Sequence, residues 1–289
     1  MIELNRYIKS DIYLKQDRLN NLPLFLFSGL SKYQNVLHFI TTRQGGYSKA
    51  PFHAFNLAFH VGDKEENVLR NRAKLAKYLD IPLQSFTISN QVHGTNISIV
   101  GQAERGSGAT NISTALKEND AMITNQENIC LLIFVADCVP LFLYDREKKV
   151  IGLIHAGWKG TIDLITQKTV SLLQSHWDCK PQDIICAIGP SIGPCCYQVG
   201  PEVVDKVRKT FPKNKHLVQA IAKDGSGYFN LWETNKIQLL DCNIPEKNIE
   251  VAELCTCCHS DIFFSSRKEH GYTGRFAAGI MLKKSQKVL

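Results

Sequence analysis

Residues 129–156 read ICLLIFVADCVPLFLYDREKKVIGLIHA, and the prediction of the fold rests on this segment. It holds three continuous apolar runs, at 129–136, 141–144 and 150–154. Apolar runs of this length without polar alternation are typical of strands that are covered on both faces. Asp137 and Pro140 interrupt the stretch, and each run is too short to cross a bilayer. The stretch therefore predicts the centre of a sheet covered by other layers.

Outward from this stretch, the sequence predicts further strands and three helices. The strands are expected at 36–42, 86–92, 97–100, 184–188, 248–254, 262–265 and 276–282, and the helices at 63–79, 161–176 and 201–211. Asp63 and Glu66 form a capping-box pattern that would open the first helix. Strands and helices mix without strict alternation, which favours an α/β fold with a mixed sheet covered by helices. No repeat or low-complexity linker divides the chain, so we expect a single domain over residues 1–289.

Composition excludes several classes of protein. The 289 residues are 44% apolar and 21% charged, as in an ordinary globular protein and unlike a disordered chain. The net charge of +7 suits an anionic small ligand, but no basic stripe indicates a nucleic acid and no segment indicates a membrane. The first residues contain no apolar signal core, so we expect a cytoplasmic protein whose ten cysteines stay reduced. A functional thiol is then a metal ligand or a nucleophile.

Three residues with metal-binding side chains follow apolar runs. His93 comes after the predicted strand at 86–92, Cys138 follows 129–136, and His155 follows 150–154. Strand ends place side chains where they can converge on a crevice. Two histidines and one cysteine suit zinc, and three protein ligands leave one position open, as in catalytic zinc sites. Asp137 could orient a ligand or accept a proton.

Glycines after His155 favour an anion site. The segment 155–161, HAGWKGT, joins a predicted strand to a predicted helix through Gly157 and Gly160, so backbone amides can face a phosphate. Lys159 adds charge, and Thr161 is predicted to be the helix N-cap. Arg43, before another pair of glycines, could reach the same phosphate.

Four more cysteines lie in two short segments. Cys255 and Cys258 form a C-x-x-C pair, and Cys195 and Cys196 are adjacent in a loop rich in glycine and proline. A second zinc held by these residues would need ligands from distant parts of the chain, and no second C-x-x-C pair exists. We therefore expect these thiols to be reduced packing residues.

Seven segments together resemble the laccase-domain (YfiH-like) family. In the family's order, they are 41–46 (TTRQGG), 90–94 (NQVHG), 120–122 (DAM), 136–140 (ADCVP), 155–160 (HAGWKG), 189–197 (GPSIGPCCY) and 273–275 (TGR). The HAGW and ADC segments are the most specific, and the resemblance covers about residues 38–280.

The resemblance implies a single-domain, three-layer α/β/α fold with mixed β-sheets, and a zinc ion held by His93, Cys138 and His155. It also implies purine nucleoside chemistry: phosphorolysis of adenosine, inosine and methylthioadenosine to the free base and ribose 1-phosphate, with adenosine deaminase activity. The expected partners are thus a purine nucleoside and phosphate, in a monomer or homodimer. Older descriptions of the family name polyphenol oxidases or laccases, and some members are linked to peptidoglycan editing.

Other functions remain open at this stage. A copper-dependent polyphenol oxidase is disfavoured, because the nine histidines include no His-x-His pair, although Cu²⁺ could occupy the same trio. A metal-free hydrolase would use Cys138 as nucleophile and His155 or His93 as base, with peptidoglycan-precursor editing as one such activity. A scaffold without catalysis is the interpretation that the intact trio favours least.

Overall fold

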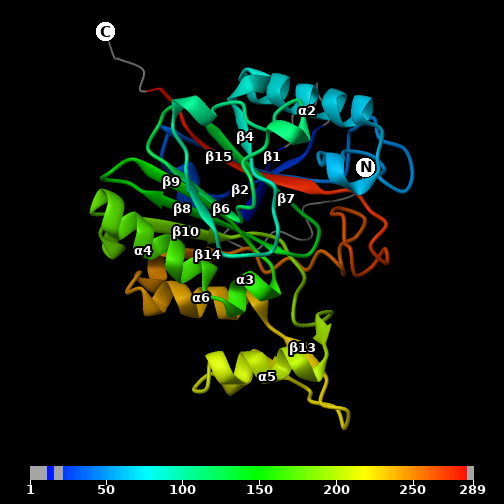
Figure 1. Ribbon diagram of the computed structural model, residues 1–289, viewed down its shortest axis with the longest axis vertical. Coiled ribbons are helices and arrows are strands. Elements are labelled where there is room, and N and C mark those ends of the chain that lie inside the picture. The colour runs from blue at the N-terminus through cyan, green and yellow to red at the C-terminus, as the bar shows by residue number, and fades with distance from the viewer. Residues whose placement is uncertain (1–11, 16–21, 285–289) are drawn as a thin grey trace.

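Two six-stranded sheets lie face to face in the computed structural model, which describes residues 12–15 and 22–284 (Figure 1). The first sheet is antiparallel except where β4 runs parallel to β7. Its strands, in spatial order, are β1 (Ile12–Lys15), β2 (Leu24–Phe27), β3 (Val36–Thr41), β15 (Phe276–Leu282), β7 (Cys130–Val135) and β4 (Phe86–Ile88). The domain prediction over residues 1–289 extends beyond the described residues at both ends.

The second sheet contains two of the three apolar runs of residues 129–156. Its two outermost pairs are parallel and its central pairs are antiparallel. Its strands, in spatial order, are β14 (Ile249–Val251), β10 (Ile184–Ile188), β8 (Val139–Asp145), β9 (Val150–Ala156), β6 (Ala121–Thr124) and β5 (Ile97–Ile99). Both sheets are therefore mixed, as the sequence predicts.

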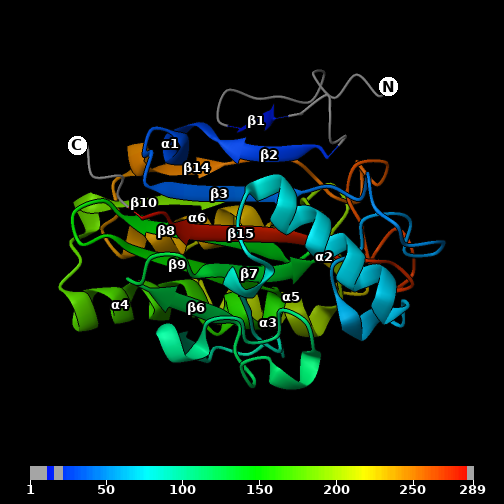
Figure 2. The same cartoon turned by 90° about the horizontal axis from the view of Figure 1, so that it is seen from above.

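Helices cover the outer face of each sheet (Figures 1 and 2). The helix α2 (Glu65–Leu79) packs on the first sheet, and α3 (Trp158–Ile162), α4 (Ile165–Trp177) and α6 (Leu231–Asp241) pack on the second. A short helix, α1 (Ser28–Ser31), follows β2. The predicted α/β fold with mixed sheets and covering helices is confirmed, and its β layer consists of two stacked sheets.

A smaller unit projects beyond the helices of the second sheet (Figure 1). It contains α5 (Pro201–Thr210) and a three-stranded antiparallel sheet formed by β11 (Gln198–Val199), β13 (Gly227–Phe229) and β12 (Val218–Gln219). Valines of α5 join the same apolar core as α3 and α6, so this unit is packed onto the body of the protein. Among the described residues, none of the helices has both the length and the apolar character that a membrane span requires.

The strand β7 shows why polar and apolar residues do not alternate within the central strands of this chain. Leu131 and Ile133 point into the core between the sheets, whereas Leu132 and Phe134 point into the core beneath α2. Each face of the strand meets an apolar layer, so polar residues on either face would be buried without partners. The predicted strands at 129–136, 141–144 and 150–154 are thus confirmed, with small shifts at their ends.

Two helix predictions need correction. The expected helix at 161–176 is two helices, because Leu164 adopts a left-handed conformation (φ 64°) that ends α3 before α4 begins. The capping box at Asp63 does not form, because Lys64 is the N-cap of α2 and makes no side-chain cap. The Asp63 carboxylate instead accepts hydrogen bonds from Ser48 Oγ (2.6 Å) and Asn56 Nδ2 (3.0 Å).

The predicted strand at 262–265 is wrong. The amides of Ile262 and Phe263 both donate to the carbonyl of His259 (3.0 and 2.9 Å), so the chain turns here. Ile262, Phe263 and Phe264 are nevertheless fully buried in the core between the sheets. Their apolar character reflects this burial and not a place in a sheet.

His38 is a buried titratable group between the two sheets. It lies on β3, is 3% exposed, and contacts the rings of Phe27 and Phe142, the latter on the facing sheet. The amide of Phe27 donates to His38 Nε2 at 2.9 Å, which requires an unprotonated nitrogen. Burial lowers the pKa of His38 to about 4. Folding therefore favours the neutral imidazole.

We expect this histidine to make the protein less stable at acidic pH. Because the folded pKa is below the unfolded value of about 6.5, the unfolded chain binds more protons as the pH falls from 7 to 5. The linkage predicts a loss of about 2 kcal/mol in the free energy of unfolding over this interval. Denaturant unfolding at both pH values measures it. His38→Gln keeps an acceptor for Phe27 but does not titrate, so an equal pH dependence in both proteins would contradict the assignment.

Candidate metal centre and its pocket

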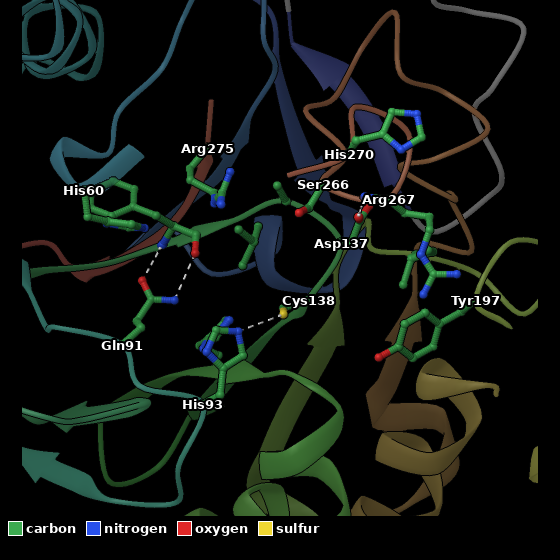
Figure 3. A pocket seen from close by; sticks show the side chains of 15 residues that line it. His60, Gln91, His93, Asp137, Cys138, Tyr197, Ser266, Arg267, His270 and Arg275 are labelled. Atoms are coloured by element: carbon green, nitrogen blue, oxygen red, sulfur yellow. Dashed lines mark hydrogen bonds between the residues drawn. The ribbon is translucent and has the colours of Figure 1, made fainter. Parts of the chain in front are cut away.

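His93, Cys138 and His155 meet where the chain passes between the two sheets. Cys138 lies on the crossing from β7 to β8, and His93 lies on the crossing from β4 to β5. His155 lies near the end of β9, where the register places it opposite Pro140. The structure therefore brings together the three residues that the sequence analysis placed at strand ends, and Figure 3 shows two of them in contact.

The three side chains fit a tetrahedral metal ion. Their ligand atoms all lie within 4.8 Å of one another, and Cys138 Sγ is 3.7 Å from His93 Nε2. Zinc bonds of about 2.3 Å to sulfur and about 2.1 Å to nitrogen would place these two atoms about 3.6 Å apart in a tetrahedron. A Cβ on Gly157 would approach His93 Cδ2 to 2.8 Å and Cys138 Sγ to 3.2 Å, so glycine keeps this space open. The donor set suits zinc and leaves a fourth position.

The carboxylate of Asp120 supports two of the three side chains. Asp120 is fully buried, and its Oδ1 accepts from the amide of His93 (2.9 Å) and lies 2.8 Å from His155 Nδ1. Its Oδ2 accepts from the amides of Val92 (3.2 Å) and Gly94 (2.7 Å). A carboxylate on Nδ1 directs His155 Nε2 toward the metal position, which is the usual outer-shell arrangement of a metal-binding histidine.

Charges at the centre reinforce one another. Burial raises the pKa of Cys138, but the neighbouring His155 and His93 outweigh it and lower that pKa to about 6. Burial lowers the pKa of His155, but Cys138 and the hydrogen bond to Asp120 raise it to about 9. Burial also raises the pKa of Asp120, whereas His155 and the amides of the 92–94 loop lower it overall. The site therefore favours a thiolate, the form that binds metals and acts as a nucleophile.

Two site residues have left-handed backbones. His93 has φ 61° and Asp137 has φ 91°, which is uncommon for residues other than glycine. The hydrogen bonds of Asp120 to three consecutive amides hold the loop at His93. The carbonyl of Asp137 accepts from the amide of Ile192 (2.9 Å), which fixes the crossing from β7 to β8. Such strain persists where surrounding contacts over-determine the conformation, and it is typical of functional sites.

A pocket of about 630 Å³ opens above the trio, within the range of small-molecule sites (Figure 3). It is lined by His60, Gln91, His93, Phe134, Val135, Ala136, Asp137, Cys138, His155, Ile192, Tyr197, Ser266, Arg267, His270 and Arg275. Gln91 is fixed by paired hydrogen bonds with the backbone of Phe134, both 2.9 Å. The pocket thus combines the trio with two arginines and two further histidines.

Asp137 holds one wall of this pocket. Its Oδ1 accepts from Thr256 Oγ1 (2.7 Å) and its Oδ2 accepts from the amide of Arg267 (2.6 Å). Arg267 in turn donates from Nη1 to the carbonyls of Cys196 (3.3 Å) and Gln198 (3.0 Å), with its guanidinium over the ring of Tyr197. Asp137 therefore links its own loop to the segments that carry Thr256 and Arg267.

Arg43, the first of the predicted phosphate ligands, lies outside the lining of the pocket. Its guanidinium donates to the carbonyls of His53 (3.1 Å) and Ser260 (2.6 Å) and forms an ion pair with Glu269 (2.9 Å). It also stacks over the ring of Phe264. These contacts tie Arg43 to the loop that follows residue 259.

The glycine segment after His155 also differs from its prediction. Gly157 is the N-cap of α3, whereas Thr161 lies inside that helix, where its Oγ1 accepts from Asn235 Nδ2 (3.2 Å). Lys159 is exposed and does not line the pocket. Gly160 lies beneath the 92–94 loop, since a Cβ there would come within 2.9 Å of the carbonyl of residue 94. Gly157 is the residue of this group that reaches the trio.

Several residues of the site have no assigned role in the sequence analysis. Asp120 lies beneath the trio and begins a recognised segment, which was a usable signal. Arg275 was also part of a recognised segment. Tyr197 ends the recognised segment 189–197, but the point where its loop meets the loop of Arg267 depends on the tertiary fold.

Comparisons with known proteins agree with this geometry. Residues 37–283 match the family described as multi-copper polyphenol oxidoreductase laccase. A purine nucleoside phosphorylase, YlmD of Geobacillus stearothermophilus, is 39% identical over 256 residues, which are 89% of this chain and 93% of that protein. The adenosine deaminase RL5 of an unknown prokaryotic organism is 29% identical over 86% of this chain and 95% of its own length.

A solved structure has the same fold. The hypothetical protein YfiH of Bacillus licheniformis superposes with a TM-score of 0.88 and 37% sequence identity, covering 93% of this chain and 99% of that one. The predicted resemblance is confirmed, and this chain belongs to the laccase-domain (YfiH-like) family.

Proposed function

We propose that this protein is a zinc-dependent purine nucleoside enzyme. It cleaves adenosine, inosine and methylthioadenosine with phosphate to the free base and ribose 1-phosphate, and it deaminates adenosine. The observation that carries the proposal is the open His93, Cys138 and His155 trio, backed by Asp120, at the floor of a pocket that also contains two arginines. The names of the similar proteins, a phosphorylase and a deaminase, support the same chemistry.

The trio would hold the zinc ion, which when bound supplies a Lewis acid at the pocket floor. Asp120 keeps the proton of His155 on Nδ1 and so directs the lone pair of Nε2 toward the metal position. Gly157 leaves room for the ligands. The thiolate form of Cys138 is favoured before any metal enters, so the proton released on binding comes from Nε2 of His155, whose pKa is raised.

Arg267 and Arg275 are the cations that we assign to phosphate. Arg275 donates from Nη1 to the carbonyls of Thr273 (2.9 Å) and Gly274 (3.0 Å), which fixes its position. A guanidinium has five N–H donors in a fork that matches phosphate, so further donors can point into the pocket. In phosphorolysis, a phosphate oxygen bonds to C1′ of the ribose, the bond from C1′ to the base nitrogen breaks, and the base takes up a proton.

Tyr197 and Asp137 complete the wall. Burial raises the pKa of Tyr197, so its hydroxyl keeps its proton and can donate a hydrogen bond to substrate. Both carboxylate oxygens of Asp137 already accept hydrogen bonds from Thr256 and Arg267. We therefore assign Asp137 to positioning Arg267, in preference to accepting a proton from substrate.

A metal-free cysteine hydrolase is the second candidate, because the Cys138 sulfur lies 3.7 Å from His93 Nε2 and its pKa is lowered. The two candidates respond differently to chelators. A zinc enzyme loses activity on prolonged chelation and regains it with added zinc, whereas a metal-free hydrolase is indifferent. Copper analysis of protein purified without added metal tests the oxidase named in the family description.

Replacement of Cys138 tests the proposal directly. We expect Cys138→Ala to abolish both zinc binding and the turnover of adenosine with phosphate, because the only sulfur ligand of the trio is lost. Chromatography identifies the products: adenine with ribose 1-phosphate for phosphorolysis and inosine for deamination. Cys242→Ala, at a buried cysteine that ends α6, is the matched control. The proposal would be contradicted if Cys138→Ala kept full turnover, or if the wild type formed neither product.

Asp120→Asn tests the support beneath the ligands. An amide cannot accept all four N–H donors equally, so we expect zinc affinity to fall by about 10- to 100-fold, in line with other outer-shell changes. Competition with a zinc indicator measures the affinity. Asp145→Asn is the control, since Asp145 is also fully buried and accepts backbone amides, but at the opposite end of β8. Equal losses in both variants would mean a general effect on folding.

Arg275→Gln separates the two reactions. A hydrogen bond between charged groups contributes about 1.5–3 kcal/mol, so we expect the KM for phosphate to rise by about tenfold or more. Deamination needs no phosphate and should change less. Steady-state kinetics of both reactions provide the comparison. A larger rise in the KM for phosphate from Lys159→Gln than from Arg275→Gln would favour the assignment made from the sequence.

A further inference from the structure

A group of four cysteines lies beside the pocket wall. Cys195, Cys196, Cys255 and Cys258, here called the cysteine cluster, have sulfur atoms that all lie within 4.8 Å of one another. Cys258 Sγ is 3.5 Å from Cys195 Sγ and 3.4 Å from Cys196 Sγ. From the sequence we expected reduced packing thiols at these positions. The fold instead collects four of the ten cysteines from segments about 60 residues apart.

The spacing of the cysteine cluster matches a tetrahedral four-thiolate site. Zinc–sulfur bonds of about 2.3 Å place sulfur atoms about 3.8 Å apart in a tetrahedron. The measured separations of 3.4 and 3.5 Å need only small adjustment to reach this value. A disulfide would use one partner for Cys258, yet two sulfur atoms approach it almost equally. The arrangement around Cys258 is therefore that of several ligands around a common point.

Backbone contacts hold the two cysteine-bearing segments in place. Ser191 and Cys255 form a β-bridge, and the amide of Thr256 donates to the carbonyl of Ser191 (3.1 Å). The amide of Gly193 donates to Cys255 Sγ at 3.2 Å, the kind of contact that stabilises a thiolate. A Cβ on Gly193 would approach Cys255 Cβ to 3.2 Å, so the turn before Cys195 needs glycine for this approach.

We propose that the cysteine cluster binds a structural zinc ion, distinct from the ion of the proposed active site. Four cysteine ligands fill the tetrahedron and leave no position for a substrate, which is the closed arrangement of structural zinc sites. Cys255 and Cys258 supply the C-x-x-C spacing that is common among such ligands. Cys195 and Cys258 are exposed, which gives the ion a path of entry.

The ion would lie next to the pocket wall and would stabilise it. Tyr197 follows Cys196, and both Tyr197 and Arg267 line the pocket. The carbonyl of Cys196 accepts from Arg267, and Thr256, next to Cys255, donates to Asp137. A metal that joins the two segments would therefore hold the wall that carries Arg267 and Tyr197. The ion contributes to pocket shape without taking part in the reaction.

Metal analysis tests this inference. In protein purified under reducing conditions without added metal, we expect about two zinc ions per chain in the wild type and about one in a Cys195→Ser/Cys258→Ser double variant. Cys138→Ala should also retain about one. Cys257→Ser is the matched control, because Cys257 lies between the C-x-x-C cysteines but is not in the cluster, and it should retain about two.

Cobalt substitution identifies which site is lost. A tetrahedral four-thiolate cobalt site gives intense sulfur-to-metal charge-transfer absorption, which should persist in Cys138→Ala and Cys257→Ser and vanish in the double variant. Far-ultraviolet circular dichroism shows whether the double variant folds. If it does not fold, the single variant Cys258→Ser is a milder substitution for the same measurement.

Equal zinc content in the wild type and the double variant would overturn the inference. So would mass spectrometry showing a Cys195–Cys258 or Cys196–Cys258 disulfide in the protein from reducing conditions. Neither result depends on the turnover of adenosine.

Discussion

The buried carboxylate of Asp120 is the constraint on which the geometry of the site depends. A charge with no exposed surface is tolerated only where its lone pairs are matched by donors, and Asp120 has four of them. Three come from consecutive amides of the 92–94 loop, and the fourth is the ring of His155. If either partner moved away, part of a buried charge would be left unpaired. The left-handed backbone of His93 and the orientation of His155 are thus held by the same group.

The two-sheet architecture explains why Asp120 can contact both the 92–94 loop and His155. The register of β6 against β9 pairs Ala121 with Ile154, which brings Asp120 beside His155 at the end of the pair. The amide of His155 also donates to the carbonyl of Asp120 (2.7 Å). Cys138 and His93 arrive on two separate crossings between the sheets. Such crossings interrupt the ladder of backbone hydrogen bonds, and so side chains there are free to face a shared cavity instead of a neighbouring strand.

The sequence was sufficient to predict the central apolar strands and the meeting of His93, Cys138 and His155. It was not sufficient to predict which strands share a sheet or which loops meet at the pocket. Continuous apolar runs identify β7, β8 and β9, because both faces of these strands meet apolar layers. The same runs do not reveal that β7 belongs to one sheet and β8 to the other, since either arrangement buries the same surface. Isolated apolar residues in a turn, such as Ile262 and Phe263, resemble a strand for the same reason. Arg275 ends a recognised segment, but the sequence does not show that it meets Arg267 at one pocket, because that depends on how the loops pack.

Ligand chemistry separates the trio from the cysteine cluster. The trio mixes one thiolate with two imidazoles and faces a pocket, so an ion held there keeps a position for substrate. The cysteine cluster offers sulfur alone. The two are nonetheless linked through Asp137, which precedes Cys138 in the chain and accepts a hydrogen bond from Thr256 beside Cys255. Because Asp137 also holds the amide of Arg267, a shift of the cluster segments would reach both the sulfur ligand of the trio and the cation that we assign to phosphate. A rigid closed site next to an open one would thus limit such shifts while leaving the reacting position accessible.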